Sequence, residues 1–549
     1  MRTATTLLLL AALACGDDDA PTPDAGLDAS SPDATSPDAM PGADAGPPGD
    51  AGPPPIEGPT ALTEGGALVG ALEDGVRVWR GIPYAAPPVG ELRFRPPRPH
   101  PGWEGWREAT ANGPICPQRE RDGTAPVGEE DCLTLQVFAP ASEGPHPVMV
   151  WIHGGGFVQG AGSLPLYDGH ALVQRGDVVV VTLNYRVGAL GFLASEELVA
   201  ESEAGVAGNM GLRDQVLALE WVRRNIGAFG GDPDAVTIFG ESAGGVSVCA
   251  LLGAPAAEGL FDRAIVQSGG GCYGWPLLDG TTLTEPVSAL ERGAEITAAA
   301  GCADEADPLA CLRALDAEAL VEATWMASSS GLGLPDVGPT VDGDLLPAET
   351  WDRFGDGSAP DKPILIGSNA DEAKTFVAAV PVPTAMAYED LVRRTVPLFA
   401  DELLALYPAS DFASPKAAYE ALYSDLAFIC PANAFAAQAA GGSAPSRAYH
   451  FTHTLTGAAA LGAFHGLEIF YVFDNLAELP RYTPVPADAA LVTTMQDAWL
   501  AFARGEDPAG WPAFDPAAPS YRIFTEPATT ASEVREGRCA ELEALGLVR

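Results

Sequence analysis

Basic residues are scarce in this chain of 549 residues, which has 30 Lys and Arg against 74 Asp and Glu. A protein that binds nucleic acid needs a basic surface to neutralise phosphates, so the composition argues against a nucleic-acid partner. Residues 1–58 hold ten of the acidic residues and one basic residue, which leaves a formal charge of −35 on residues 59–549. Such an excess is typical of a well-solvated acidic surface.

The N-terminus lacks an apolar run long enough to span a bilayer, because the stretch that begins at Leu7 ends by Cys15 and three Asp residues follow. With Arg2 before it and small residues before Cys15, this stretch predicts an export signal over residues 1–15. A cysteine at the cleavage point also resembles a bacterial lipoprotein signal, in which Cys15 carries the lipid. The protein is therefore expected to be exported, and to be either lipid-anchored at the bacterial cell envelope or secreted. The protein would contact a membrane only through that lipid anchor.

Residues 16–58 lack the apolar side chains that a core requires, since they are almost entirely Asp, Pro, Ala, Gly, Ser and Thr. They predict a disordered spacer that precedes a folded domain over residues 59–549. No repeat of 20 to 50 residues follows the spacer, which argues against a solenoid or a propeller.

Short runs of β-branched and aliphatic residues end in glycine-bearing turns and predict strands that are buried on both faces. They lie at 147–152, 178–183, 236–239, 264–266 and 363–366. Helical patterns separate them, such as 212–226, where apolar residues recur at spacings of three and four. The alternation predicts an α/β fold with a large, mostly parallel central sheet flanked by helices.

Residues 240–244 read Gly-Glu-Ser-Ala-Gly and lie between the strand at 236–239 and a helical run at 246–252. The pattern G-x-S-x-G is weak by itself, but its position between a strand and a helix is typical of a nucleophile at a sharp turn. Glycines let the backbone turn so that the Ser242 hydroxyl is exposed, while the helix amides face developing negative charge. Ser242 is therefore the predicted nucleophile.

A serine nucleophile needs hydrogen-bond donors for the oxyanion that forms during the reaction. Residues 153–157 read His-Gly-Gly-Gly-Phe and follow the strand at 147–152. Glycines leave backbone amides accessible to a ligand oxygen, so this loop is predicted to supply the donors.

The nucleophile also needs a base. In hydrolases with this kind of serine turn, the acid and then the base follow the nucleophile along the chain. Of the seven histidines, only His450, His453 and His465 come late enough in the sequence. His465 lies in a glycine-bounded loop and is the predicted base. The other two lie in a stretch at 449–453 that looks like a strand, and a structural role is predicted for both.

The acid should follow the strand at 363–366, where Asp371 and Glu372 are neighbours. Spacing alone leaves both open.

Further motifs follow in order along residues 59–549. They are Gly-Ile-Pro-Tyr-Ala at 81–85, Glu-Asp-Cys-Leu at 130–133, Thr-Leu-Asn-Tyr-Arg at 182–186, Gly-Asn-Met-Gly-Leu at 208–212, Phe-Gly-Gly-Asp-Pro at 229–233 and His-Gly-Leu-Glu-Ile at 465–469. With the serine turn, they resemble the type-B carboxylesterases, which include the cholinesterases, in the α/β-hydrolase superfamily. The resemblance implies an α/β-hydrolase fold and hydrolysis of small-molecule carboxylic esters without a metal or organic cofactor.

The same resemblance implies roles for individual residues. The acid would be Glu372, and the oxyanion donors would be the amides of Gly155, Gly156 and Ala243.

Nine cysteines in an exported protein suggest a disulfide framework, and eight remain when Cys15 is set aside. The resemblance implies the pairs Cys116–Cys132, Cys302–Cys311 and Cys430–Cys539. For Cys249 and Cys272, a fourth bridge and two buried thiols both stay open.

Residues 117–131 contain no tryptophan. Cholinesterases carry one in the corresponding loop, where it stacks on the choline cation, so a choline-specific enzyme is not expected. The leading hypothesis is a broad carboxylesterase, with a lipase or a specialised ester hydrolase as the alternative among enzymes. A non-catalytic adhesion or binding protein is the rival from another class, and the presence of Ser242, Glu372 and His465 argues against it.

Overall fold

The computed structural model describes residues 58–120, 125–282, 286–327 and 336–549. The predicted export signal with Cys15, and the predicted spacer except for Gly58, lie outside the described residues. Within these ranges no helix has the length and the apolar character needed to cross a membrane.

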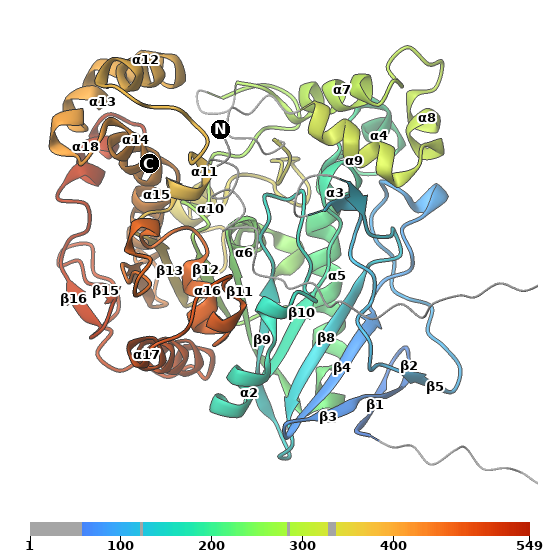
Figure 1. Ribbon diagram of the computed structural model, residues 1–549. Coiled ribbons are helices and arrows are strands. Elements are labelled where there is room, and N and C mark those ends of the chain that lie inside the picture. The colour runs from blue at the N-terminus through green and yellow to red at the C-terminus, as the bar shows by residue number, and fades with distance from the viewer. Residues whose placement is uncertain (1–57, 121–124, 283–285, 328–335) are drawn as a thin grey trace, which may run out of the picture.

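Eleven strands form the central sheet (Figure 1), in the order β16-β15-β14-β13-β12-β11-β9-β10-β8-β4-β3. Their bounds are β3 Ala71–Glu73, β4 Val76–Pro83, β8 Thr134–Pro140, β9 His146–Ile152, β10 Val179–Leu183, β11 Gly231–Glu241, β12 Arg263–Gln267, β13 Ile364–Asn369, β14 Ser446–Phe451, β15 Tyr521–Phe524 and β16 Thr529–Ala531. The strands from β10 to β15 in this order run parallel, and antiparallel strands complete both edges. This sheet, with helices on its faces, confirms the predicted fold class.

Small sheets lie outside the central one. They consist of β1 Thr60–Thr63, β2 Gly66–Val69 and β5 Trp106–Glu108, and of β6 Gln118–Arg119 and β7 Pro126–Val127.

Helices flank the sheet and extend beyond it. They are α2 His170–Gly176, α3 Gly188–Phe192, α4 Glu196–Glu201, α5 Met210–Asn225, α6 Ala243–Gly253, α7 Ala289–Ala299, α8 Pro308–Ala314, α9 Ala317–Met326, α10 Thr350–Gly355, α11 Ala373–Phe376, α12 Ala385–Thr395, α13 Ala400–Leu406, α14 Pro415–Ser424, α15 Cys430–Ala439, α16 Leu467–Val472, α17 Pro486–Ala503 and α18 Arg538–Ala544. A π-helical turn, η7 Asp425–Ile429, joins α14 to α15.

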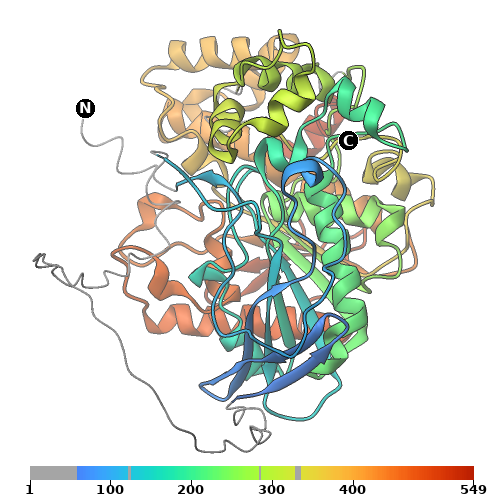
Figure 2. The same cartoon turned by 90° about the vertical axis from the view of Figure 1, so that its right-hand side faces the viewer.

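The sheet is buried on both faces because successive side chains of its strands point to opposite sides. On β9, Val148 and Val150 pack in a core that includes side chains of α5 and α6, while Met149 and Trp151 pack in a second core with α16 and α17. Figure 2 shows the sheet between green α5 on the right and the orange-red α17 on the left. The predicted strands buried on both faces are therefore present.

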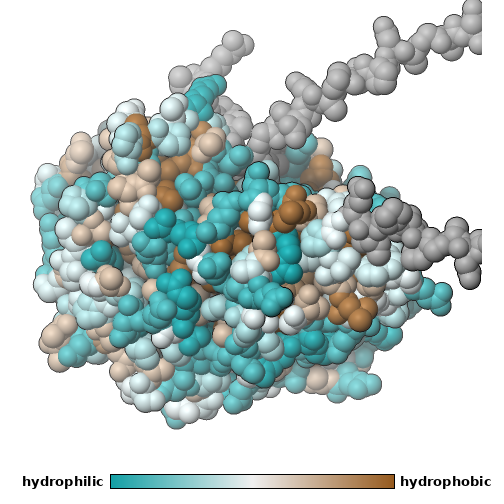
Figure 3. All heavy atoms as spheres, turned by 90° about the horizontal axis from the view of Figure 1, so that it is seen from below, coloured by the Kyte–Doolittle hydropathy of each residue, from teal (hydrophilic) through white to brown (hydrophobic). Residues whose placement is uncertain are grey.

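Two further groups of helices have cores of their own, α3 with α7–α9 and α12 with α13 and α14. In Figure 1 they lie above the sheet, at the two upper corners. Seen from below in Figure 3, the opposite face is mostly hydrophilic, with apolar residues in small separate patches.

The described residues contain four disulfides, Cys116–Cys132, Cys249–Cys272, Cys302–Cys311 and Cys430–Cys539. The pair that the sequence left open is a bridge, which joins α6 to the segment after β12. A framework of this kind is typical of proteins that fold outside the reducing cytosol.

Element bounds differ from the sequence expectations in detail. β11 reaches back to Gly231 and forward to Glu241, because Gly231 pairs with β9 ahead of a register shift and the residues from Val236 onward pair with β9 and β12. The stretch predicted as a strand at 449–453 lies partly in β14, which ends at Phe451.

Candidate active site

Ser242 lies in a tight turn at the carboxyl end of β11, directly before α6. Its backbone has φ 56° and ψ −125°, a conformation that is costly for a residue with a side chain and is typical of functional turns. The Ser242 amide donates to the carbonyl of Gln267 on β12 at 3.0 Å. Ser242 as a whole is half-buried, unlike its buried neighbours Glu241 and Ala243.

The two glycines that flank this turn are required by close backbone contacts. A Cβ atom on Gly244 would lie 2.0 Å from the carbonyl oxygen of Ile152, and one on Gly240 would lie 2.7 Å from the same atom. Any larger residue would push α6 away from the end of β9. This close approach fixes the position of Ala243, the first residue of α6. The Ala243 amide is one of the first amides of the helix, which have no hydrogen-bond acceptor within the helix.

The glycine loop after β9 lies against the serine turn. A Cβ atom on Gly154 would lie 3.0 Å from Cβ of Ser242, which shows how near the two segments are. Gly155 and Gly156 have φ values of 109° and 62°, which glycine adopts without strain. The structure therefore brings Gly155, Gly156 and Ala243 to the same edge of the sheet as Ser242.

His153, the first residue of the glycine loop, is held in place by Tyr185. Its ring stacks on Tyr185 with centroids 4.3 Å apart, and the Tyr185 hydroxyl donates to the His153 carbonyl at 2.8 Å. Burial lowers the pKa of His153 to about 4. The ring is therefore neutral at ordinary pH and acts as a support for the glycine loop.

Glu372 follows β13 and is completely buried. Its Oε1 atom accepts hydrogen bonds from Ser268 Oγ and from the Asn369 amide, both at 2.7 Å. Its Oε2 atom lies 2.6 Å from Nδ1 of His465. Three contacts thus fix the orientation of this carboxylate.

Asp371 has a different environment from its neighbour. Its backbone pairs with Phe464, its Oδ2 atom accepts from the Ala463 amide at 2.9 Å, and its Oδ1 atom lies 3.1 Å from Nζ of Lys374. Its side chain is 33% exposed. Asp371 therefore holds the loop that leads to His465, whereas Glu372 contacts the imidazole itself.

His465 lies between two carboxylates, with its side chain 10% exposed. On the side opposite Glu372, its Nε2 atom lies 3.1 Å from Oε1 of Glu241, the residue directly before Ser242. The rings of Phe376 and Phe428 pack against it at 4.8 and 4.9 Å. The imidazole is thus placed beside the serine turn.

Glu241 and Glu468 are buried carboxylates behind the turn. Glu468 accepts from Asn369 Nδ2 and from Gln267 Nε2. Burial raises the pKa of both Glu241 and Glu468 above the usual carboxyl range. Burial lowers the pKa of His465, but the charges of Glu241 and Glu372 outweigh it and raise that pKa to about 9.

The other two late histidines lie elsewhere. His450, on β14, has its Nδ1 atom 3.5 Å from Ser368 Oγ, and burial together with the charge of Arg535 lowers its pKa to about 3. The Nε2 atom of His453 lies 3.3 Å from Asp488. The structure therefore brings His465 alone of the three into contact with Glu372 and Glu241.

Sequence reasoning missed Ser268, Glu241 and Glu468. The first two were visible only as residues next to recognised features, Ser268 one residue after β12 and Glu241 inside the serine pentapeptide. Glu468 lies in the stretch at 465–469, three residues after His465 and in the first turn of α16, and this closeness in the sequence was the available signal.

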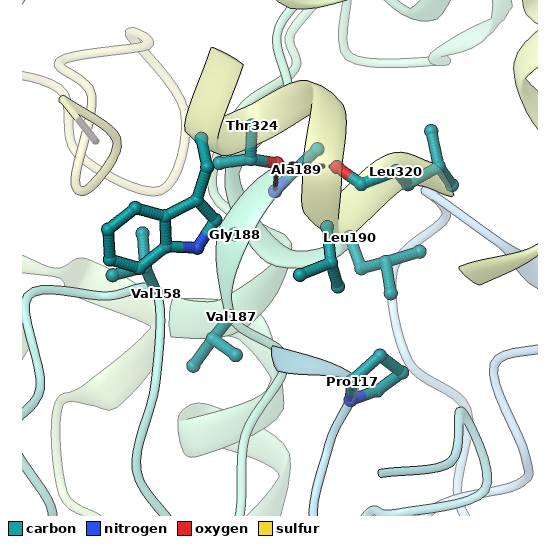
Figure 4. A pocket seen from close by; sticks show the side chains of 10 residues that line it. Pro117, Val158, Val187, Gly188, Ala189, Leu190, Leu320 and Thr324 are labelled. Carbon is teal, nitrogen blue, oxygen red and sulfur yellow. Dashed lines mark hydrogen bonds between the residues drawn. The ribbon is translucent and has the colours of Figure 1, made fainter. Parts of the chain in front are cut away.

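A small pocket, open to solvent, lies beyond the glycine loop, between α3 and α9 (Figure 4). Apolar side chains such as Val158 line it, and the Thr324 hydroxyl accepts from the Ala189 amide at 3.1 Å. The Gly188 amide donates to the carbonyl of Phe157 at 2.6 Å, so the pocket wall and the glycine loop are directly connected. Its lining favours apolar groups over charged ones.

In the described part of the chain, no group of three or more His, Cys, Asp or Glu side chains could hold a metal ion.

The sheet, the serine turn and the neighbouring imidazole define a hydrolase with the α/β-hydrolase fold. The sequence profile of the Carboxylesterase family matches residues 57–542, and the chain therefore belongs to this family of carboxylic ester hydrolases. The predicted family and enzyme class are confirmed.

Individual relatives and solved structures agree with this family assignment. The chain is 40% identical over 474 residues to a fumonisin B1 esterase of Sphingopyxis macrogoltabida, covering 82% of this chain and 84% of the relative. It is 39% identical over 469 residues to a para-nitrobenzyl esterase of Bacillus subtilis, covering 82% and 92%. A solved PNB esterase superposes with a TM-score of 0.76 at 37% identity, covering 88% of this chain and 99% of that one. A Geobacillus stearothermophilus carboxylesterase gives the same four values.

Proposed function

We propose that this protein hydrolyses neutral carboxylic esters through an acyl-enzyme on Ser242, with His465 as the base and Glu372 as the acid that orients it. The observation that carries the proposal is the position of His465. Its Nδ1 atom contacts Glu372 at 2.6 Å, and its Nε2 atom faces the serine turn, 3.1 Å from the residue that precedes Ser242.

In the first half of the reaction, Nε2 of His465 takes the proton of the Ser242 hydroxyl as Oγ bonds to the ester carbonyl carbon. The carbonyl oxygen becomes an oxyanion, which the amides of Gly155, Gly156 and Ala243 stabilise. The imidazolium then gives its proton to the alkoxy oxygen as the carbon–oxygen bond breaks, and the alcohol leaves.

In the second half, His465 takes a proton from water, whose oxygen attacks the acyl carbon. The tetrahedral intermediate collapses, the imidazolium returns the proton to Oγ of Ser242, and the carboxylic acid departs. Glu372 keeps the proton of Nδ1 on the side away from the serine and stabilises the imidazolium. Ser268 and the Asn369 amide hold Glu372 for that task by occupying its other oxygen.

Neutral esters suit this site better than charged ones. The formal charge of −35 on residues 59–549 disfavours anionic substrates. Residues 117–131 have no tryptophan for a choline cation. Relatives include a para-nitrobenzyl esterase, so a para-nitrobenzyl ester is a suitable first substrate.

Two alternatives have less support. A lipase would cleave the same chemical bond and would differ only in preferring esters with longer acyl chains and in binding to lipid surfaces. A non-catalytic binding protein does not require the strained Ser242 backbone or a carboxylate held by three contacts, and such features persist where function needs them.

Export is part of the proposal. Residues 1–15 would direct it, residues 16–58 would act as a spacer for the catalytic domain at 59–549, and Cys15 would carry a lipid if the signal is of the lipoprotein type. The four disulfides support a location outside the cytosol.

The proposal is tested by turnover of a neutral chromogenic ester, measured for the natural chain and for Ser242→Ala. We expect hydrolysis by the former and its near-complete loss in the variant. Turnover by Ser242→Ala at the natural rate would overturn the proposal, and so would the absence of hydrolysis across acyl chains of all lengths.

A further inference from the structure

An ion pair beside the active site is not used by the chemistry above. Nε of Arg535 lies 2.6 Å from Oδ1 of Asp425, whose side chain is completely buried. The Tyr407 hydroxyl donates to the other oxygen of Asp425 at 2.9 Å. Arg535 also donates from Nη2 to the carbonyl of Ala370, two residues before Glu372. The pair therefore connects η7 to the backbone of the segment that carries the acid.

A second contact holds the other side of Glu372. The amide of Ala373, the next residue, donates to Ser424 Oγ at 2.9 Å, and Ser424 in turn donates to the carbonyl of Glu420 at 2.7 Å. Ser424 and Asp425 are consecutive residues at the junction of α14 and η7. The backbone before and after Glu372 is thus connected to the same junction, at Ala370 through Arg535 to Asp425 and at Ala373 directly through Ser424.

The same turn also reaches the base. Phe428, in η7, packs on the His465 ring at 4.9 Å and stacks on Phe376 at 5.7 Å. Phe376 also packs on the His465 ring, with the ring centroids 4.8 Å apart. Single π-helical turns are frequent at functional sites, where the extra residue redirects the side chains that follow. Here the turn that is anchored through Asp425 presents Phe428 to the imidazole.

A buried ion pair is weak evidence for stability, since apolar replacements are often as stable. A fixed position is a different requirement. The contact between Glu372 and His465 depends on the placement of two segments that are far apart in the chain. A misplacement of about 1 Å can reduce turnover by about 10²-fold.

We propose that Arg535 and Asp425 are positioning residues, which with Ser424 hold Glu372 and His465 at hydrogen-bond distance. The inference rests on the proposed function of those two residues. Around them, His465 is faced by Glu372, Glu241 and Glu468, and Asp425 is faced by Arg535, Arg538 and Tyr407.

Two variants each release one side of Glu372. Arg535→Lys keeps the positive charge but lacks the forked group that reaches both Asp425 and Ala370. Ser424→Ala removes the acceptor for the Ala373 amide and changes little else in volume. Each should lower kcat by about 10- to 100-fold with KM within about twofold of the natural value, because alignment matters most in the transition state.

The acid limb of the pH–rate profile supplies a readout that lost stability alone would not move. Glu372 raises the pKa of His465. A loosened Glu372 should lower the pKa of that base and shift the acid limb to lower pH in both variants.

The matched control is Glu130→Gln, which weakens the ion pair of Arg93 with Glu130. Those side chains are 7% and 14% exposed, and Arg93 also donates to the Leu315 carbonyl at 2.6 Å. The control should lose thermal stability while its kcat per active site and its acid limb stay natural. Active sites are counted by titration with an organophosphonate ester.

Natural kcat and a natural acid limb in both folded variants would overturn the proposal. If Arg535→Lys does not fold, the result for Ser424→Ala decides. Ser242→Ala is assayed in parallel, and its retention of natural turnover would mean that the proposed function has failed, whatever the two variants do.

Discussion

Oε2 of Glu372 lies 2.6 Å from Nδ1 of His465, although 93 positions separate the two residues along the chain. The neighbouring carboxylate of Asp371 bonds instead to the Ala463 amide, two residues before the histidine. Adjacent acids therefore perform two tasks. One contacts the imidazole, and the other holds the loop that delivers it.

This division predicts unequal effects of two isosteric changes. In Glu372→Gln the amide oxygen can still accept from Ser268 and the Asn369 amide, but the NH₂ group then faces Nδ1 and forces the wrong tautomer of His465. We expect turnover to fall by about 10³-fold or more with little change in folding. Asp371→Asn should reduce turnover by about 10-fold or less. A larger effect at Asp371, measured by kcat at saturating ester, would show that the acid has been assigned to the wrong residue.

Loss of the base should be as severe as loss of the nucleophile. His465→Ala is expected to lower turnover by about 10⁴-fold or more, because members of a triad act as a unit. His450→Gln and His453→Gln serve as controls and should retain most of the activity. Mass spectrometry should also find an organophosphonate on Ser242 and on no other residue. A label elsewhere contradicts the assignment of the nucleophile.

The pH dependence should reflect the carboxylates around His465. The imidazole must be neutral to act as a base, and a raised pKa keeps it protonated to higher pH. An unperturbed imidazole has a pKa of about 6.5. On acidification, activity should therefore begin to fall at a pH above this value. In Glu241→Gln a source of this increase is removed, so the acid limb should move to lower pH. An unchanged limb in that variant would mean that Glu241 does not act on the pKa of the base.

The bridge between Cys249 and Cys272 should contribute to stability. Peptide mapping without reduction is expected to recover this pair and the other three. The double change to alanine removes the bridge and should lower the free energy of unfolding by about 2–4 kcal/mol. Denaturant unfolding of the double variant checks this, and a crossed pairing in the peptide map would contradict the framework.

Charge should influence the choice of substrate at long range. With −35 on residues 59–549, a neutral ester should be preferred over an analogue that bears a carboxylate. The preference, measured as the ratio of kcat/KM values, should weaken between 0.01 and 0.15 M salt, as the screening length falls from about 30 to about 8 Å. A ratio that does not change with salt would point to local contacts in the pocket.

The fold and part of the site could be predicted because their signals are local. The apolar runs of β9 and β10 fix a buried parallel sheet, and the glycines at 240 and 244 are needed by contacts with Ile152. The motif itself is a few consecutive residues and can be recognised without the fold, although the Ile152 contact that makes these glycines necessary comes from a distant segment.

Other features depend on contacts between distant segments. Spacing in the sequence left Asp371 and Glu372 open and did not decide between a bridge and two thiols at Cys249 and Cys272. Nor did it place Glu241 3.1 Å from His465. The sequence by itself thus determined the sheet, the serine turn and the glycine loop. The family resemblance implied Glu372 as the acid, but the tertiary structure alone decided that Glu241 also lies beside the imidazole, because the order of the parallel strands, and not proximity in the chain, brings the end of β11 close to His465.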